Sequence, residues 1–219
     1  MQTDWMRAKT SQYIDIHGEL YPYDKVLSFF ETVESEFDVL RYCSGANAAA
    51  RWIFQVYNRE FIQELADLIN EALAILGDSK PVLEVMGGDG RLSEFLKAQV
   101  GSEIICTDSR QGGYDIAYPK WVLQLSALES VERFHPSLVI ISWEPFFSTA
   151  GQNIVDMGVP TVWIGDREHC AVHSEMFSSP HVRMNSEFAL GRKDSFISGE
   201  FKTDIYLFNW PGMIDGQGV

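Results

Sequence analysis

Cysteine and long apolar runs are both scarce in this sequence of 219 residues. The three cysteines, Cys43, Cys106 and Cys170, lie far apart, and their odd number argues against a framework of disulfide bonds. No apolar run approaches the length that spans a bilayer, and the first 20 residues contain none that could act as a secretion signal. We therefore expect a soluble, cytoplasmic protein with reduced cysteines and no membrane partner.

Positive charge is the other deficit. The chain has 17 Lys and Arg residues against 31 Asp and Glu residues, which gives a formal net charge of −14. Such a surface repels phosphate backbones, so nucleic acid is not an expected partner. Apolar residues nevertheless make up 46% of the chain, which is enough for a sizeable core and argues against disorder. We expect a single domain over residues 1–219, because no linker or repeat divides the chain.

The segment 81–109 has the pattern of a strand, a glycine-rich turn, a helix and a second strand. The short apolar set Val82, Leu83 and Val85 is typical of a parallel strand that is covered on both faces. Three glycines in the turn 87–90 allow the backbone to bend sharply and a ligand to approach closely. The helix that follows presents unpaired N–H groups, and Asp108 at the end of the second strand can accept both hydroxyls of a ribose. The segment therefore predicts a nucleoside site.

Two residues indicate which nucleoside is bound. A dinucleotide fingerprint requires glycine at the position of Ser93. The same fingerprint requires no acid at the position of Glu84, and an acid there can receive an ammonium group directly or through water. S-adenosylmethionine (SAM) carries both a ribose diol and an α-ammonium group, so the pattern favours SAM over NAD.

At this point the sequence resembles the class I SAM-dependent methyltransferases. The stretch Glu84-Val85-Met86-Gly87-Gly88-Asp89-Gly90 resembles their first motif, acid-x-G-x-G-x-G, with Met86 in place of the first glycine. Asp108 resembles the acid of the second motif, and Ser126 followed by Ala127 partly matches the acid and small residue that meet the adenine. The resemblance implies SAM as cofactor and a set of cofactor-binding residues, which comprises Glu84, Met86, Gly87, Gly88, Gly90, Asp108, Ser109, Ser126, Ala127 and Ser142.

The fold expected from the whole chain is α/β, with a seven-stranded, doubly wound, mostly parallel sheet and a terminal antiparallel hairpin. An N-terminal helical extension, 1–78, precedes a SAM-binding Rossmann-like core, 79–219. In the extension the apolar periodicity predicts helices over 24–40, 48–57 and 58–77. In the core the predicted strands are 82–85, 104–108, 122–128, 138–141 and 162–164, followed by the hairpin of 181–188 with 203–210. The extension either closes over the site, as is frequent in the family that the chain resembles, or packs on the outside of the sheet.

Glu144 and His169 are the candidate catalytic residues, because each follows a central strand at the end of the sheet where ligands bind. Methyl transfer from SAM needs alignment and exclusion of water, and an acceptor hydroxyl or protonated amine also needs a general base. The competing interpretations are that Glu144 caps a helix and that His169 is an ordinary loop histidine. The stretch 166–173, which also contains His173, lacks a second pair of ligands, so no metal is expected.

The sequence thus predicts a SAM-dependent methyltransferase that acts on an uncharged, partly apolar small molecule. Two alternatives remain open. One is a catalytically degenerate relative that binds SAM or a partner without turnover, because Met86 and Ser126 depart from the motifs. The other is an NAD-dependent oxidoreductase of the same fold class, against which Ser93 and Glu84 count. A homodimer is left open as well.

Overall fold

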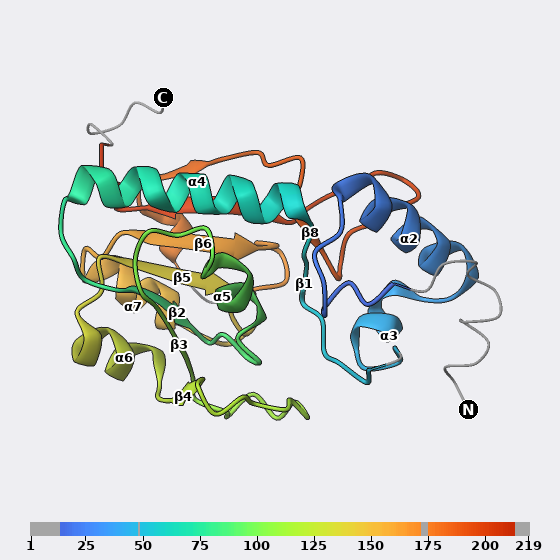
Figure 1. Ribbon diagram of the computed structural model, residues 1–219, viewed down its shortest axis with the longest axis horizontal. Helices are drawn as coiled ribbons and strands as arrows, with labels where there is room; N and C mark the ends of the chain where they lie inside the picture. The colour runs from blue at the N-terminus through green and yellow to red at the C-terminus, as the bar shows by residue number, and fades with distance from the viewer. Residues whose placement is uncertain (1–13, 48, 172–174, 213–219) are drawn as a thin grey trace.

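The computed structural model describes residues 14–47, 49–171 and 175–212 and centres on a seven-stranded sheet (Figure 1). In spatial order the strands are β4 (Leu123–Gln124), β3 (Ile104–Asp108), β2 (Val82–Val85), β5 (Leu138–Ser142), β6 (Thr161–Gly165), β9 (Asp204–Phe208) and β7 (His181–Arg183). Neighbouring strands run parallel from β4 to β6, and β9 is antiparallel to both β6 and β7. The predicted α/β architecture, a mostly parallel sheet with a terminal antiparallel pair, is confirmed.

The order of the strands reverses between β2 and β5. From β2 the chain moves outward through β3 and β4, then returns to β5 and proceeds in the other direction to β6. Ligands of open parallel sheets bind beyond the carboxyl ends of the strands at such a switch point. The dinucleotide-binding order has six parallel strands, and this sheet departs from it because antiparallel β9 lies between β6 and β7.

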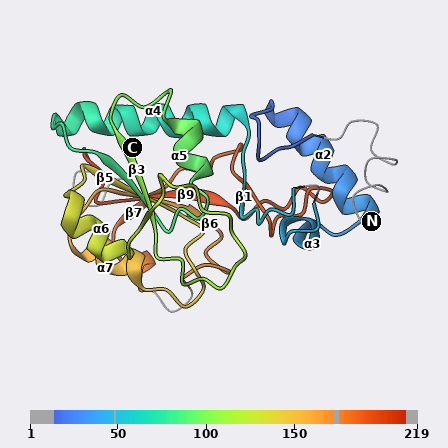
Figure 2. The same cartoon turned by 60° about the horizontal axis from the view of Figure 1, so that its bottom comes forward.

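Helices cover both faces of the sheet (Figure 2). The helices α4 (Arg59–Leu76) and α5 (Arg91–Leu96) cover one face, and α6 (Ala127–Phe134) and α7 (Ala150–Asp156) cover the other. Successive strand residues point to opposite faces, so Val82 packs in the first core and Leu83 in the second. This is why the central strands are apolar on both faces, with Glu84 of β2 as an exception.

Helix α4 has clear signals at both ends. The side chain of Asn58 accepts a hydrogen bond from the Phe61 amide at 2.8 Å, and Gly77 ends the helix with a φ of 63°. The buried face of α4 packs against the sheet, where Phe61 and Leu65 are fully buried. The helix therefore belongs to the layered core, whereas the sequence analysis assigned residues 58–77 to the extension.

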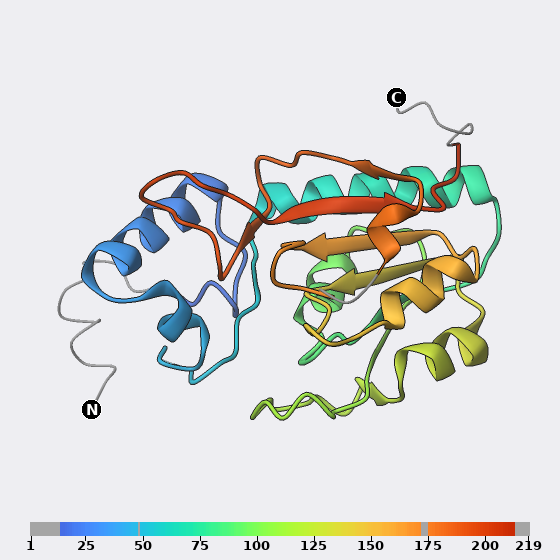
Figure 3. The ribbon, with the colours of Figure 1, turned by 180° about the vertical axis from the view of Figure 1, so that it is seen from behind.

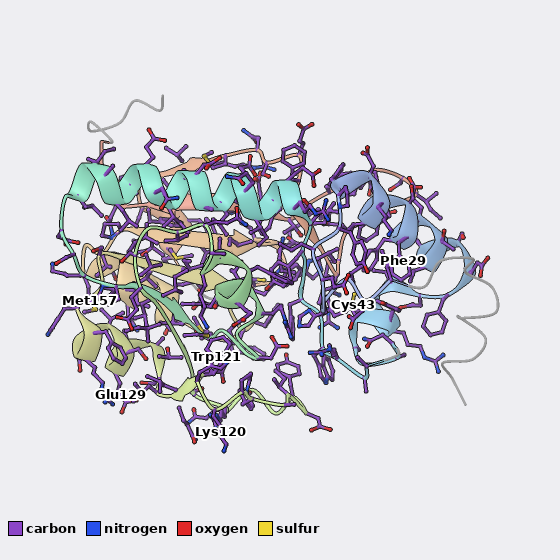
Figure 4. The ribbon with its side chains drawn as sticks, in the orientation of Figure 1. Phe29, Cys43, Lys120, Trp121, Glu129 and Met157 are labelled. Atoms are coloured by element: carbon purple, nitrogen blue, oxygen red, sulfur yellow. The ribbon has the colours of Figure 1, made fainter. Side chains whose placement is uncertain are left out.

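The remaining N-terminal elements form a second, smaller unit with its own core. It contains α2 (Tyr23–Glu36), α3 (Val39–Cys43) and β1 (Gln55–Val56), and β1 pairs with β8 (Leu190–Gly191). Phe29 and Cys43 belong to this core, and so do Leu190 and Phe196 from the C-terminal part of the chain (Figure 4). Seen from behind, the segment 192–203 reaches across to the N-terminal helices (Figure 3). The unit is thus assembled from both ends of the sequence, and we call it the N-terminal unit.

Three predicted elements differ from the structure. The helix predicted over 24–40 is interrupted, because Asp38 accepts a hydrogen bond from the Arg41 amide and starts α3 as a separate helix. In the described part of 48–57 there is no helix: the Asn47 side chain bonds the backbone of Arg51 and closes a turn, and the chain then extends into β1. The strand predicted over 122–128 is confined to β4, because α6 begins immediately after it.

The 3₁₀ turn η1 (Met176–Ser178) completes the elements of the described residues. Among the helices of that part of the chain, none combines the length and the apolar composition that crossing a membrane requires.

Candidate functional site

A cavity of about 550 Å³ opens at the carboxyl ends of β2, β3, β5 and β6, which is where the strand order reverses. The sheet contributes the turn after β2, the end of β3 and the segments that follow β5 and β6. The loop between β3 and β4 supplies further wall residues, and the N-terminal unit supplies His17 and most of the segment 49–57. Two parts of the chain that are distant in sequence therefore enclose one site.

The N-terminal unit contacts the glycine turn directly. His17 Nε2 lies 2.8 Å from Asp89 Oδ2, and Arg51 Nη1 lies 3.7 Å from the same oxygen. Burial raises the pKa of Asp89, but the bonds to His17 and to the Arg91 amide outweigh burial, so the pKa is lowered overall. Within the predicted extension, His17 and the segment 49–57 therefore lie against the carboxyl end of the sheet, whereas α4 packs on one of its faces.

The turn after β2 keeps a left-handed backbone even where the sequence has no glycine. Met86 has a φ of 56°, and Gly88 and Gly90 have φ values of 56° and 73°. This conformation costs a non-glycine residue about 1–2 kcal/mol. A Cβ on Gly87 would lie 2.9 Å from the carboxyl carbon of Glu84, so only glycine fits there. The methionine therefore replaces the first glycine of the motif without changing the course of the turn.

Glu84 lies beneath this turn and is only 2% exposed. Its Oε2 accepts hydrogen bonds from the Ser93 amide at 3.0 Å and from the Ser93 hydroxyl, and the Cys106 thiol also bonds the carboxylate. Burial outweighs these bonds and raises the pKa of Glu84 to about 7. Ser93 therefore binds Glu84, the acid that distinguishes the SAM pattern. It does so from the position at which a dinucleotide motif has its third glycine.

Asp108 stands at the end of β3 beside the glycine turn. Its Oδ2 accepts a hydrogen bond from the Gly88 amide at 3.0 Å, and its Oδ1 accepts one from the Arg110 amide at 2.6 Å. The Tyr118 hydroxyl also bonds this carboxylate. These bonds fix the orientation of the carboxylate, and the residue lines the cavity. The position fits the ribose-binding role that the sequence predicts for Asp108.

The wall of the cavity is acidic. Its carboxylates outnumber its permanent cations by five to one: Glu84, Asp89, Asp108, Asp115 and Glu144 against Arg51. In helix α5, which follows the turn, the backbone amide of Ser93 already donates a hydrogen bond to the Glu84 carboxylate. A pyrophosphate would be repelled by these carboxylates, whereas a ligand with ammonium and sulfonium charges would be attracted.

Glu144 is buried, 1% exposed, at the start of α7. Its Oε1 accepts hydrogen bonds from the Ser148 hydroxyl at 2.7 Å and from the Gly151 amide at 2.8 Å, and its Oε2 accepts one from Trp163 Nε1 at 3.1 Å. Burial raises the pKa of this carboxyl. Because its oxygens already bind the helix end and the core, the geometry favours the capping interpretation over a role as catalytic base.

His169 has the geometry of an oriented base. Its Nδ1 lies 2.5 Å from Oδ2 of Asp166, and the other oxygen of Asp166 accepts the Glu168 amide at 2.8 Å. Asp166 is 1% exposed, whereas the imidazole is 37% exposed and lines the cavity. A buried carboxylate that holds one imidazole nitrogen leaves the other to exchange a proton. His169 was predicted from the sequence, whereas this role of Asp166 was not, although its spacing of three residues from His169 was a signal for it.

Ligand atoms of Asp166, Glu168 and His169 lie within 4.8 Å of one another, which is the spacing of a metal site. Their bonds are nevertheless made within the protein, because Asp166 holds His169 and Glu168 pairs with Lys202 Nζ at 2.6 Å. His173, the other histidine of this stretch, lies outside the described residues.

Most of the predicted cofactor residues lie together. Glu84, Met86, Gly87, Gly88, Asp108, Ser109 and Ser142 line the cavity, and Gly90 shapes the turn from beneath the Trp121 ring. Ser126 and Ala127 do not line the cavity. Ser126 instead caps α6 in a reciprocal arrangement with Glu129, which lies on the exposed side of that helix (Figure 4). Sequence reasoning missed the aromatic residues that the segment 49–57 contributes, because that segment was expected to be helical.

Comparison with known proteins finds similarity among solved structures. A candidate SAM-dependent methyltransferase from Streptococcus mutans matches 68% of this chain and 47% of its own, with 11% identity and a TM-score of 0.39. An S-adenosyl-L-methionine methyl transferase from Silicibacter pomeroyi DSS-3 matches 67% of this chain and 94% of its own, with 19% identity and a TM-score of 0.34. A candidate methyltransferase complexed with SAH matches 63% of this chain and 47% of its own, with 12% identity and a TM-score of 0.32.

The matched region thus spans about half of the first and third of these proteins. No protein-family model matches the sequence, and no curated protein matches it. The function is therefore inferred from the chemistry of the cavity.

Proposed function

We propose that this protein binds SAM in the cavity and transfers the methyl group to a small-molecule acceptor. The observation that carries the proposal is the acidic wall around a glycine turn at the switch point of the sheet. Asp108 would accept the ribose hydroxyls, and Glu84 would receive the ammonium group directly or through water. NAD fits less well, because its pyrophosphate would lie among the carboxylates of the turn.

His169 is the proposed base for an acceptor that must lose a proton. The acceptor oxygen or nitrogen attacks the methyl carbon, the bond between that carbon and the sulfonium sulfur breaks, and S-adenosylhomocysteine (SAH) is the second product. The proton of the acceptor passes to the imidazole nitrogen that does not face Asp166. Asp166, whose Oδ2 lies 2.5 Å from Nδ1, keeps the imidazole oriented during this transfer.

Calorimetric titration with SAH and with NAD tests the cofactor. We expect SAH to bind and to raise the melting temperature by mass action, and NAD to do neither. The variant Gly88→Val should lose SAH binding, because its backbone needs a φ of 56° and a β-branched residue is strained there. Binding of NAD, or no heat with millimolar SAH, would contradict the proposal.

Turnover is tested with methyl-labelled SAM and a panel of small-molecule acceptors. His169→Asn should retain SAH affinity and lower turnover by about 100-fold, the scale of a positioned acid–base group. His135→Asn is the matched control, because His135 is exposed and has a φ of 44° that asparagine tolerates. SAH binding without turnover of any acceptor would instead favour the non-catalytic alternative.

A further inference from the structure

Four aromatic side chains form one wall of the cavity, and we call them the aromatic wall: Trp52, Phe54, Tyr114 and Trp143. Tyr114 contacts both residues of the N-terminal unit, with ring centroids 4.9 Å from Trp52 and 5.2 Å from Phe54. The ring centroids of Phe54 and Trp143 lie 6.4 Å apart. The rings come from the N-terminal unit, from the loop after β3 and from the end of β5, so the wall exists only in the assembled fold.

Trp143 is held in place at the cost of backbone strain. Its φ is 56°, a conformation that is rare for a bulky residue and that clusters at ligand sites. Its ring packs directly against the backbone of Gly191, where an added Cβ would collide with the indole. Its Nε1 donates a hydrogen bond to Gln55 Oε1 at 2.9 Å. The indole therefore has a single, well-determined orientation at the edge of the cavity.

The bond to Trp143 also determines the orientation of the Gln55 amide. An indole nitrogen can only donate, so the oxygen of Gln55 faces it and the nitrogen, Nε2, faces elsewhere. Gln55 is 2% exposed and lines the cavity, and its Nε2 has no hydrogen-bond partner among the described residues. A buried donor without an acceptor is unfavourable, so a ligand atom that accepts this bond is favoured there.

Arg192 supports the aromatic wall from outside the cavity. Its guanidinium lies 4.7 Å from the Phe54 ring centroid and 5.6 Å from that of Trp52, and its Nη2 bonds the Ser44 hydroxyl. Arg192 is not among the residues that line the cavity. Since these rings already interact with one cation, a second cation is less favourable there than a neutral ring.

We infer that the methyl acceptor is a neutral, planar aromatic molecule that carries a hydrogen-bond-accepting atom such as a carbonyl oxygen. Its ring packs on the aromatic wall, and its accepting atom receives a hydrogen bond from Gln55 Nε2. That the bound molecule is the methyl acceptor rests on the proposed function. The subsite itself can be tested without turnover and without SAM.

The test uses calorimetric titration with three probes: 2-quinolone, which has an aromatic ring and a carbonyl; indole, which has a ring without a carbonyl; and 2-piperidone, which has the carbonyl without an aromatic ring. We expect 2-quinolone to bind more tightly than indole, and 2-piperidone not to bind. Gln55→Met removes both the donor Nε2 and the acceptor of Trp143 Nε1. Binding of 2-quinolone should therefore weaken about tenfold, whereas binding of indole, which makes no bond to Nε2, should weaken much less. The indole titration thus shows that the variant is folded and that the wall is intact. Trp52→Leu should weaken both ring probes.

The inference is overturned if 2-quinolone does not bind the parent protein, or if Gln55→Met and the parent bind it equally. A parallel titration with SAH separates the two proposals. If the aromatic probes bind and SAH does not, the proposed function is contradicted but the inferred subsite is still supported. If SAH binds and the aromatic probes do not, only the subsite is contradicted. In Gln55→Met the affinity for SAH should stay within about twofold of the parent, which separates a lost donor from a damaged fold.

Discussion

The substitution Glu84→Gln tests the electrostatics of the site most directly. Glu84 has a pKa of about 7 in the folded protein, against 4.5 for an ordinary glutamate, and burial is the cause. The two values differ by about 2.5, which corresponds to about 3 kcal/mol. Because the unfolded chain loses this proton at lower pH, the contribution of Glu84 to stability is fully present below pH 4.5 and is lost as the pH rises to about 7. The neutral glutamine removes this contribution.

Denaturant unfolding of the parent and the variant at pH values from 4 to 8 measures the effect. The stability difference should move in favour of Glu84→Gln by about 3 kcal/mol over this range. Asp89, Tyr57 and Cys106 face Glu84 and are present in both proteins, so the comparison isolates the glutamate. Parallel stability curves would show that Glu84 ionises normally and would refute the reasoning.

The same group predicts a pH-dependent affinity for the ligand. An ammonium group favours the ionised carboxylate, which is about tenfold more abundant at pH 8 than at pH 6 for a pKa of about 7. SAH should therefore bind the parent about tenfold more tightly at pH 8. Glu84→Gln should bind SAH more weakly and without this increase, and an increase that persists in the variant would contradict the assignment to Glu84.

Three further substitutions separate binding from stability. Asp108→Ala should weaken SAH about tenfold or more in calorimetry, because two ribose hydroxyls lose their acceptor; unchanged affinity would exclude that role. Glu144→Ala should lower the free energy of unfolding by about 2–4 kcal/mol, because the hydrogen-bond donors of Ser148, Gly151 and Trp163 lose their acceptor. The affinity for SAH should stay within about twofold. The opposite pattern would mark Glu144 as part of the ligand site. Met86→Gly should retain SAH binding and change stability by no more than about 1 kcal/mol in thermal melts. Glycine adopts the left-handed turn freely, but it also makes the unfolded chain more flexible, so the two effects oppose each other. Loss of binding would show that the methionine side chain contacts the ligand.

Much of the sheet was predictable from the sequence, because the relevant signals are local. The central strands are rich in apolar residues, as strands covered on both faces must be, although β2 contains Glu84, and α4 has a capping residue and a terminating glycine. The turn 87–90 and Asp108 are also local signals, and the prediction of a nucleoside site was based on them. Parallel strands bring their carboxyl ends to one edge, so residues that follow different strands, such as Gly88, Asp108 and His169, meet there.

Helix boundaries and short strands were less predictable. The segment 49–57 has apolar residues at helical spacing, yet it extends and pairs with β8, a partner more than 130 residues later in the chain. Ser126 was expected to lie at the end of the predicted strand 122–128 and to meet the adenine. Its hydroxyl and the Glu129 side chain instead form the reciprocal cap of α6, a local preference that outweighed the motif.

The strands, the glycine turn and the acidic residues of the proposed nucleoside site were thus encoded locally, in apolar stretches, turn chemistry and the order of the elements. The tertiary structure decided which groups are buried and which remain unpaired. Burial raises the pKa of Glu84, the end of α7 takes up Glu144, and Asp166 orients His169. The aromatic wall and the unpaired Gln55 amide arise only where the N-terminal unit, β8 and the end of β5 pack together, since no local pattern records contacts between segments so far apart in the chain.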